Sequence, residues 1–378
     1  MILPGFCLLL LIVYIVLMIL YLYGWLKQPL YHMSDGYVPY TSISIIIAAR
    51  NEEANIGKCI DAILAQQYPR HLLEVIVVDD HSTDGTAVVV NSYKDDRVRY
   101  ISLAAHMNAE DVVAYKKKAI ATGIAHSTGK LIITTDADCT GPSKWLAHIA
   151  AKYEQEEPVL IVAPVDFTND ASLVQVFQSL DFMSMQGITA ASHYMKMGNM
   201  SNGANLAFSR EAYLQVDGYN GIDHLASGDD YLLMMKLQKE FPSRIGYLKS
   251  KAAIVSTPPQ PDWLGFYRQR IRWASKSGKY DDQKMTIVLS FVYIFNLAMF
   301  VLAIGCIFNK GYLPVLGVCI GTKIVAELIY LYPVARFFNK RRQLWVFPLL
   351  QPLHILYIVL VGFAGFTGTY QWKGRTVK

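Results

Sequence analysis

Hydrophobic positions along the chain form four long segments, separated by a central region in which they recur in short runs. Three of the long segments contain no charged residue, and they span residues 1–26, 285–309 and 343–372. The fourth, residues 312–335, is interrupted only by Lys323 and Glu327. About 20 apolar residues cross a hydrocarbon core of about 30 Å, so each segment predicts a membrane-spanning helix.

The segment 1–26 is predicted to be an N-terminal transmembrane anchor. A cleaved signal peptide is the alternative, but the segment has no basic start and no small-residue cleavage site, and its apolar run is too long. Residues 285–372 are predicted to form a C-terminal membrane domain of about three hydrophobic segments. Lys323 and Glu327 lie four residues apart and are expected to pair on one helix face.

The central region, residues 42–280, alternates strand-like and helix-like patterns. Continuous apolar runs at 44–48, 74–78, 98–103 and 131–135 predict strands, and apolar periodicity at 55–66 and 231–239 predicts helices. Continuous apolar strands that alternate with helices indicate a mostly parallel sheet with helices on both faces, which is an α/β fold. A proline-rich turn at 258–261 then precedes residues 267–274, which we expect near the membrane interface.

Composition narrows the function classes. Hydrophobic residues make up 53% of the 378 positions, and the net charge is only +5 without a basic tract, so nucleic acid is not an expected partner. The five cysteines include no CxxC pair, which argues against a zinc site or a disulfide framework and fits a reducing compartment.

Acidic residues follow the predicted strands. Asp136 and Asp138 come directly after the run 131–135, and Asp229 and Asp230 open the helix 231–239. Ligands of open α/β sheets bind at the carboxyl ends of strands. Two neighbouring carboxylates repel each other, and Mg²⁺ or Mn²⁺ shared with a diphosphate would relieve that repulsion. The alternative is that these aspartates are turn formers or helix N-terminal residues.

Basic residues that could balance these carboxylates occur in two groups. These are Lys116, Lys117 and Lys118, and Arg268, Arg270 and Arg272. We expect Lys117 and Lys118 to be solvated.

Motifs in register across residues 42–273 give the chain a family resemblance. They are Arg50-Asn51-Glu52-Glu53, the turn 78–86 around Asp79-Asp80, Asp136-Ala137-Asp138, Gly228-Asp229-Asp230, and the Gln-x-x-Arg-Trp motif at 269–273. With them the chain resembles an inverting, membrane-bound glycosyltransferase of family 2. That group contains cellulose, chitin and hyaluronan synthases and ceramide glucosyltransferase, and the resemblance implies the Rossmann-like GT-A fold.

The resemblance also implies a role for each motif residue. The nucleotide pocket would contain Arg50, Glu52, Asp79 and Asp80, and Lys116 would contact the nucleotide. Asp136 and Asp138 would hold the divalent cation (Mg²⁺ or Mn²⁺) and the sugar diphosphate. Asp230 would be the general base, with Asp229 beside it, and Arg272 would clamp the diphosphate. Gln269 and Trp273 would bind substrate, although Trp273 could instead be an interfacial anchor. Two positions depart from the family pattern, since Asp229 replaces a usual Glu and Ala121 a usual Asn.

The implied reaction moves a sugar from a nucleotide-sugar donor, with a UDP-sugar favoured, to a lipid, lipid-linked or glycan acceptor. The implied location is a multi-pass protein of the plasma or inner membrane, surrounded by membrane lipids, with its catalytic domain (42–280) in the cytoplasm. Lys27 and the basic cluster at 336–342 agree with positive-inside placement. The last segment leaves the topology open, because Pro348 and Pro352 favour a kink or re-entry.

Two other functions remain open at this point. One is a processive polysaccharide synthase, with a polysaccharide-export partner supplying the channel, although four predicted helices are few for enclosing a sugar chain. The other is a catalytically silent subunit that binds a sugar nucleotide within a membrane assembly complex.

Overall fold

A computed structural model describes residues 2–105, 114–168, 171–197, 200–225, 227–275, 282–365, 370–372 and 375–377. The chain divides into two compact units. A sheet unit comprises Leu30–Thr168 and Met200–Pro258, and a helical unit comprises Met1–Pro29, Asn169–Asn199 and Pro259–Lys378. The predicted catalytic domain, residues 42–280, includes residues 171–197 and 259–275, which group by their contacts with the helical unit.

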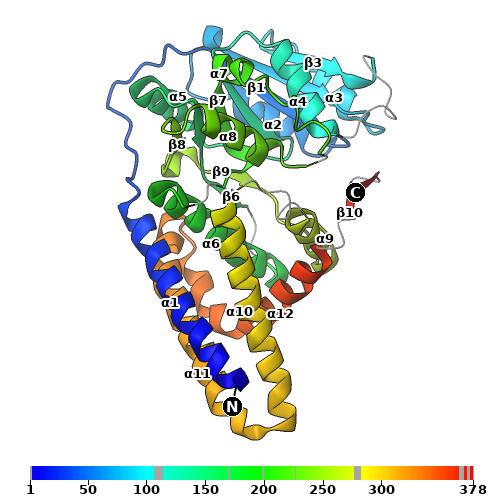
Figure 1. The fold of residues 1–378 in the computed structure, drawn as a ribbon. Helices are drawn as coiled ribbons and strands as arrows, with labels where there is room; N and C mark the ends of the chain where they lie inside the picture. Colours follow the sequence, from blue (N-terminus) through cyan, green and yellow to red (C-terminus); the bar gives the residue numbers. More distant parts are fainter. Residues whose placement is uncertain are drawn as a thin grey trace. The chain divides into compact units, whose positions relative to one another are not determined.

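The sheet unit is built on a seven-stranded sheet of order β3-β2-β1-β4-β7-β5-β8 (Figure 1). Its strands are β1 (Ile43–Ala49), β2 (Leu73–Asp79), β3 (Val98–Ser102), β4 (Leu131–Asp136), β5 (Leu160–Val162), β7 (Leu206–Ser209) and β8 (Ile245–Tyr247). Neighbouring strands run parallel except β7, which is antiparallel to both β4 and β5. The short strands β6 (Val165–Phe167) and β9 (Val255–Thr257) form a separate parallel pair. The predicted mostly parallel α/β sheet is confirmed.

Strand register brings the polar ends of β1, β2 and β4 together. Ala49 pairs with Asp79 of β2, and Ala48 pairs with Asp136 of β4. Each strand is buried over most of its length, and the polar residues at and after its carboxyl end therefore emerge at one edge of the sheet.

Helices cover both faces of this sheet. Successive strand residues point to opposite faces, and Ile45, Ile46 and Ile47 of β1 are all fully buried. On the face of Ile46, helix α4 packs so closely that a Cβ on Gly123 would lie 2.6 Å from the Ile46 side chain. The helices of this unit are α2 (Ile56–Leu64), α3 (Thr86–Asn91), α4 (Tyr115–Ala125), α5 (Trp145–Glu156), α7 (Arg210–Gln215) and α8 (Asp229–Glu240).

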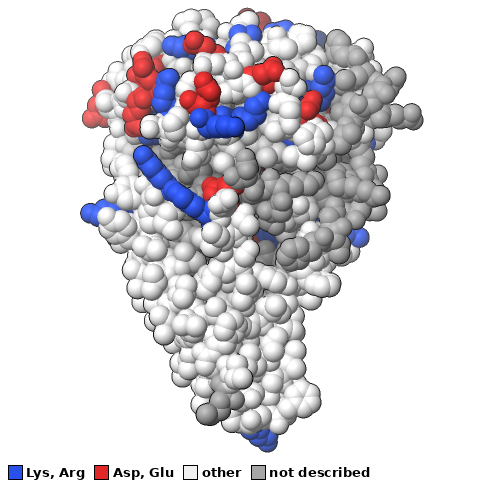
Figure 2. Space-filling model, in the orientation of Figure 1, with Lys and Arg blue, Asp and Glu red and all other residues white. Residues whose placement is uncertain are grey.

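The helical unit contains the long apolar helices. These are α1 (Ile2–Lys27), α10 (Gln283–Phe308), α11 (Leu313–Phe337) and α12 (Phe347–Gly365). The unit also contains the helices α6 (Leu173–Met195) and α9 (Trp263–Ala274) and the strands β10 (Tyr370–Trp372) and β11 (Arg375–Val377). Within the described residues, α1, α10, α11 and α12 are long and apolar enough to span a membrane, as predicted. In Figure 2 most of the visible charge lies on the sheet unit, and the visible surface of the long helices is almost uncharged.

The intramembrane pair predicted from sequence is present. Lys323 Nζ lies 2.7 Å from Glu327 Oε1, and it also donates to Gln351 Oε1 of α12 at 2.7 Å. Gln351 Nε2 donates to the other Glu327 oxygen, and Tyr14 of α1 donates to Glu327 as well. Lys323 and Glu327 therefore pair with each other and are also hydrogen-bonded by Tyr14 of α1 and Gln351 of α12, which fits a structural role.

Candidate active site

Two left-handed turns follow β1 and β2 at the polar edge of the sheet. Asn51 has φ 51° and His81 has φ 56°, a conformation that residues other than glycine seldom adopt. Arg50 Nη1 links the two turns by donating to the backbone oxygens of Asp80 (2.8 Å) and His81 (3.1 Å). These contacts hold the predicted nucleotide-pocket residues in one place.

The acidic residues of these turns are hydrogen-bonded, and Asp79 and Asp80 are buried while Glu52 is half-buried. Asp79 accepts from Ser82 N at 3.0 Å and from the Tyr100 hydroxyl at 2.8 Å. The Asp80 carboxylate lies 2.9 Å from His81 Nδ1. Glu52 Oε2 accepts from the Asn55 side chain at 3.1 Å. The four predicted pocket residues therefore lie on adjoining turns.

The two carboxylates after β4 occupy different environments. Asp136 is half-exposed and pairs with Lys116, whereas Asp138 is more buried and accepts from Thr257 Oγ1 at 3.3 Å and Cys139 Sγ at 3.6 Å. Burial raises the pKa of Asp138 to about 6, with the charges of Asp136 and Glu52 adding to the effect.

This donor set fits a hard divalent cation. Carboxylate oxygens are the ligands that Mg²⁺ and Mn²⁺ prefer, and a cation would offset the negative charge that raises the pKa of Asp138. Across the described residues, no group of three or more His, Cys, Asp or Glu side chains is placed to hold a metal ion. Asp136 and Asp138 could supply two carboxylates to such an ion, and its other ligands would be water and diphosphate oxygens.

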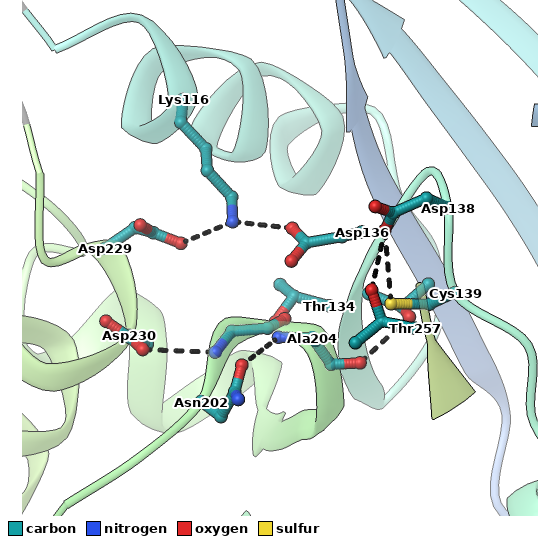
Figure 3. Close-up of polar contacts among 12 residues, drawn as sticks. Lys116, Thr134, Asp136, Asp138, Cys139, Asn202, Ala204, Asp229, Asp230 and Thr257 are labelled. Atoms are coloured by element: carbon teal, nitrogen blue, oxygen red, sulfur yellow. Dashed lines mark hydrogen bonds and ion pairs between the residues drawn. The ribbon is translucent and has the colours of Figure 1, made fainter. Parts of the chain in front are cut away.

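Lys116 joins the two acidic groups (Figure 3). Its Nζ lies 2.7 Å from Asp136 Oδ1 and 3.3 Å from Asp229 Oδ2. Although burial lowers the pKa of Lys116, the carboxylates of Asp136 and Asp229 outweigh it and raise that pKa above its usual value. The sequence predicted a nucleotide contact for this lysine, and its contacts in the structure are to these carboxylates.

The segment before β7 completes the site. Gly203 N donates to Asp230 Oδ2 at 3.1 Å, and Thr134 of β4 donates to the Gly203 carbonyl at 3.0 Å. A Cβ on Gly203 would lie 3.0 Å from Asp229 Oδ2 and 3.4 Å from Lys116 Nζ. One short stretch of backbone therefore brings the end of β4 and the start of α8 to the same spot, as Figure 3 shows.

Lys117 corrects one sequence-based expectation. It was expected to be solvated, yet it is 1% exposed, and its Nζ donates to the carbonyl oxygens of Ile222 (2.8 Å) and Leu225 (2.6 Å). The prediction was wrong because a run of lysines gives no sign of the carbonyl groups that a distant loop supplies. Lys118 is exposed, as expected.

The Gln-x-x-Arg-Trp motif lies on α9, in the helical unit. There Arg270, not Arg272, is the buried arginine: its Nη2 lies 2.7 Å from Asp181 Oδ2 of α6, and its guanidinium lies 4.1 Å from the centroid of the Trp273 ring. Arg272 is half-buried, as is Gln269. An approach of Arg272, Gln269 and Trp273 to the carboxylates of the sheet unit remains a prediction.

Several residues of the site were not predicted from sequence. Gly203, Thr134 and Thr257 act through backbone or hydroxyl groups, which no charge pattern reveals. The one available signal was the stretch rich in Gly, Ser and Asn at 198–205, which precedes the acidic pair Asp229 and Asp230.

Comparison with known proteins assigns the family. The sequence model of Glycosyl transferase family 2 matches residues 44–213, and that of Glycosyl transferase family group 2 matches residues 131–364, more than half of the chain. The chain belongs to the family 2 glycosyltransferases. The family that the motifs suggested is thereby confirmed, and the acidic clusters of the sheet unit fall within the matched residues.

Individual relatives match part of their own length. A beta-monoglucosyldiacylglycerol synthase of Synechocystis is 31% identical over 258 residues, which are 65% of this chain and 50% of the relative. Glycosyltransferase AglE of Haloferax volcanii is 28% identical over 190 residues, covering 50% of this chain and 58% of the relative. The chain thus spans about half the length of the curated relatives it matches.

A solved structure supports the fold. Mannosyltransferase PcManGT from Pyrobaculum calidifontis, solved in complex with GDP-Man and Mn²⁺, has a TM-score of 0.60 to this chain at 19% identity. The match covers 96% of this chain and 99% of that one. At this identity the similarity is one of fold, and it confirms the GT-A-like architecture.

Proposed function

We propose that this protein is an inverting glycosyltransferase that moves a sugar from a nucleoside-diphosphate sugar to a lipid, lipid-linked or glycan acceptor at a membrane. The observation that carries the proposal is the arrangement of Asp136, Lys116, Asp229 and Asp230 around the backbone of Gly203. A sugar-transfer site needs acidic groups for a cation and a separate carboxylate as base, and this arrangement supplies both.

In the proposed reaction, Asp230 accepts the proton of the acceptor hydroxyl. The acceptor oxygen forms a bond to the anomeric carbon while the bond from that carbon to the diphosphate oxygen breaks, and the nucleoside diphosphate leaves with the electron pair. Gly203 N–H orients Asp230 through the 3.1 Å bond to Oδ2. One base suffices for a single displacement, which inverts the anomeric configuration.

A divalent cation, Mg²⁺ or Mn²⁺, would be held by Asp136 and Asp138 and would neutralise charge on the leaving diphosphate when bound. Arg50, Glu52, Asp79 and Asp80 would line the nucleotide pocket. Arg272 would contact the diphosphate, and Gln269 and Trp273 the acceptor side. These roles rest on the motif pattern together with the contacts of each residue within its own unit.

The acceptor class is inferred from the helices and the relatives. Four candidate membrane spans favour an acceptor within or on the membrane. Two relatives have names that refer to an apolar product or acceptor, a beta-monoglucosyldiacylglycerol synthase and a 4,4'-diaponeurosporenoate glycosyltransferase. We propose a UDP-sugar as donor and the cytoplasmic face as the place of reaction, since the basic cluster Arg336, Lys340, Arg341 and Arg342 favours that orientation.

The test supplies radiolabelled UDP-glucose, UDP-N-acetylglucosamine and GDP-mannose to membranes that contain the protein, with Mn²⁺ or Mg²⁺, followed by solvent extraction. We expect label in the lipid phase with at least one donor, and an inverted anomeric configuration by NMR. Asp138→Ala and Asp230→Asn should abolish transfer, and retained transfer in both would overturn the site assignment. Label in a polymer would indicate a polysaccharide synthase, and donor binding without transfer would indicate a silent subunit.

A further inference from the structure

Lys116 occupies a position that a divalent cation would compete for. Its Nζ lies 2.7 Å from Asp136 Oδ1, one of the oxygens proposed to bind the cation. A positively charged ammonium at that distance occupies the oxygen and repels a dication. In the described part of the chain, Lys116 is the cation that pairs with Asp136, whereas the donors to Asp138 are a hydroxyl and a thiol.

Lys116 also has a second carboxylate within reach. Asp229 Oδ2 lies 3.3 Å from Nζ, so the ammonium is closer to Asp136 than to the acidic pair of α8. The lysine reaches this point from the first turn of α4, and its side chain is 27% exposed. A Cβ on Gly203 would lie 3.0 Å from Asp229 Oδ2 and 3.4 Å from Lys116 Nζ, so the backbone of Gly203 borders both groups. A short movement of Nζ would therefore exchange one carboxylate for the other.

We propose that Lys116 is the resting counter-ion of Asp136, and that loading of the cation with a nucleoside diphosphate shifts the lysine from Asp136 to Asp229 and the diphosphate. This inference rests on the proposed function. Without nucleotide, the divalent cation must displace the Lys116 ammonium from Asp136 and remain close to that positive charge, and this repulsion weakens binding of the divalent cation. A diphosphate brings negative charge that accommodates both cations, so cation and nucleotide strengthen each other's binding through Lys116.

The consequence is an order of events at the site. Asp136 becomes available to the cation as the diphosphate arrives, and Lys116 then sits beside Asp229, the neighbour of the proposed base Asp230. Lys116 thus couples occupation of the donor site to the acidic pair of α8. It is a positioning residue, because it acts through the two carboxylates and the diphosphate.

The test measures Mn²⁺ binding to the purified full-length protein by electron paramagnetic resonance, with and without UDP and, separately, GDP. We expect wild-type protein to bind Mn²⁺ at least about fivefold more tightly when the nucleotide is present. Lys116→Met should bind Mn²⁺ alone about fivefold or more tighter than wild type and lose most of the nucleotide-dependent gain. Lys118→Met is the matched control, because it removes the same charge from an exposed position of the same helix and should leave both affinities unchanged.

A second variant guards against misfolding of the first. Asp229→Asn removes the second carboxylate partner of Lys116, so the lysine stays on Asp136. This variant should therefore bind Mn²⁺ alone more weakly than wild type, which is opposite to the effect expected for Lys116→Met. If Lys116→Met binds Mn²⁺ alone no more tightly than Lys118→Met, or if Asp229→Asn tightens it, the counter-ion role is wrong while the proposed function stands. If wild-type protein binds neither Mn²⁺ nor nucleotide, the proposed function itself fails.

Discussion

The buried ion pair on the motif helix gives a prediction that can be worked through in numbers. Arg270 of α9 is 2% exposed and Asp181 of α6 is 9% exposed at the side chain, with 2.7 Å between Nη2 and Oδ2. The arginine also lies between the rings of Phe266 (4.9 Å) and Trp273 (4.1 Å). Burial by itself raises the pKa of Asp181, but Arg270 and His354 outweigh it and hold that pKa below its usual value.

The substitution Arg270→Met keeps an unbranched apolar stem in the same place and removes the guanidinium and its charge. Loss of one partner from a buried ion pair costs about 3–5 kcal/mol. Asp181 would then keep His354 Nε2, 3.4 Å from its Oδ1, as its remaining ionisable partner, so we expect a cost toward the lower end of that range. Unfolding entropy of about 2.1 cal/mol/K per residue amounts to about 0.8 kcal/mol/K for 378 residues. The expected fall in melting temperature is therefore about 4–6 °C.

The assay is thermal unfolding of detergent-purified protein followed by tryptophan fluorescence. Arg268→Met is the matched control, since Arg268 is exposed on the same helix and should melt within about 1 °C of wild type. The double variant Asp181→Asn/Arg270→Met should recover most of the loss, because no uncompensated charge remains. Equal melting temperatures for Arg270→Met and Arg268→Met would show that the ion pair between Arg270 and Asp181 does not stabilise the protein.

Three further outcomes follow from the sheet unit. Asn205→Ala should destabilise the protein by at least about 3 kcal/mol, since it removes the buried partner of Trp145 Nε1 and of two backbone carbonyls, while Asn91→Ala at an exposed helix position should change the melting temperature little. Gly203→Ala should lower kcat by about tenfold to a hundredfold at an almost unchanged melting temperature, because the added Cβ would lie 3.0 Å from Asp229 Oδ2. Gly317→Ala is the control and should leave kcat unchanged, because a Cβ at that position has no atom within 4 Å. Although burial raises the pKa of Glu74, hydrogen bonds from Ser44, Thr128 and Gly129 lower it overall. Its stabilisation is therefore fully present above the usual glutamate pKa and is lost as pH falls through the lowered folded-state pKa, so Glu74→Gln should reduce the melting temperature more at pH 7 than in acid.

Much of the fold was predictable because its strongest signals are local. The sequence runs that form β1, β2 and β4 are mostly apolar and are followed by polar residues, so both the strands and the polar edge of the sheet could be predicted. The four candidate membrane spans could be predicted from the length and apolar composition of their segments alone. The strand β7 was missed because four residues carry too little pattern, and its antiparallel direction depends on pairing with β4 and β5.

The site was predictable in its acidic residues and not in their partners. Asp136, Asp138, Asp229 and Asp230 could be found from motifs and from their position after strands. Which positively charged side chain pairs with each of these carboxylates depends on the tertiary structure. Lys116 and Lys117 are neighbours in one lysine run, yet one reaches carboxylates and the other reaches backbone carbonyls. Arg270 and Asp181 likewise meet only because α6 and α9 pack in the same unit.

The central claim is that the carboxylates after β4 and at the start of α8 form one donor and base site. It is tested most directly by a structure of the protein in lipid nanodiscs with Mn²⁺ and UDP, or GDP if the donor panel favours it. We expect the metal ion at Asp136 and Asp138, the diphosphate on that ion, and Asp230 facing the space beside the diphosphate that the donor sugar would occupy. A nucleotide bound away from these aspartates, with no metal ion at Asp136 or Asp138, would contradict it.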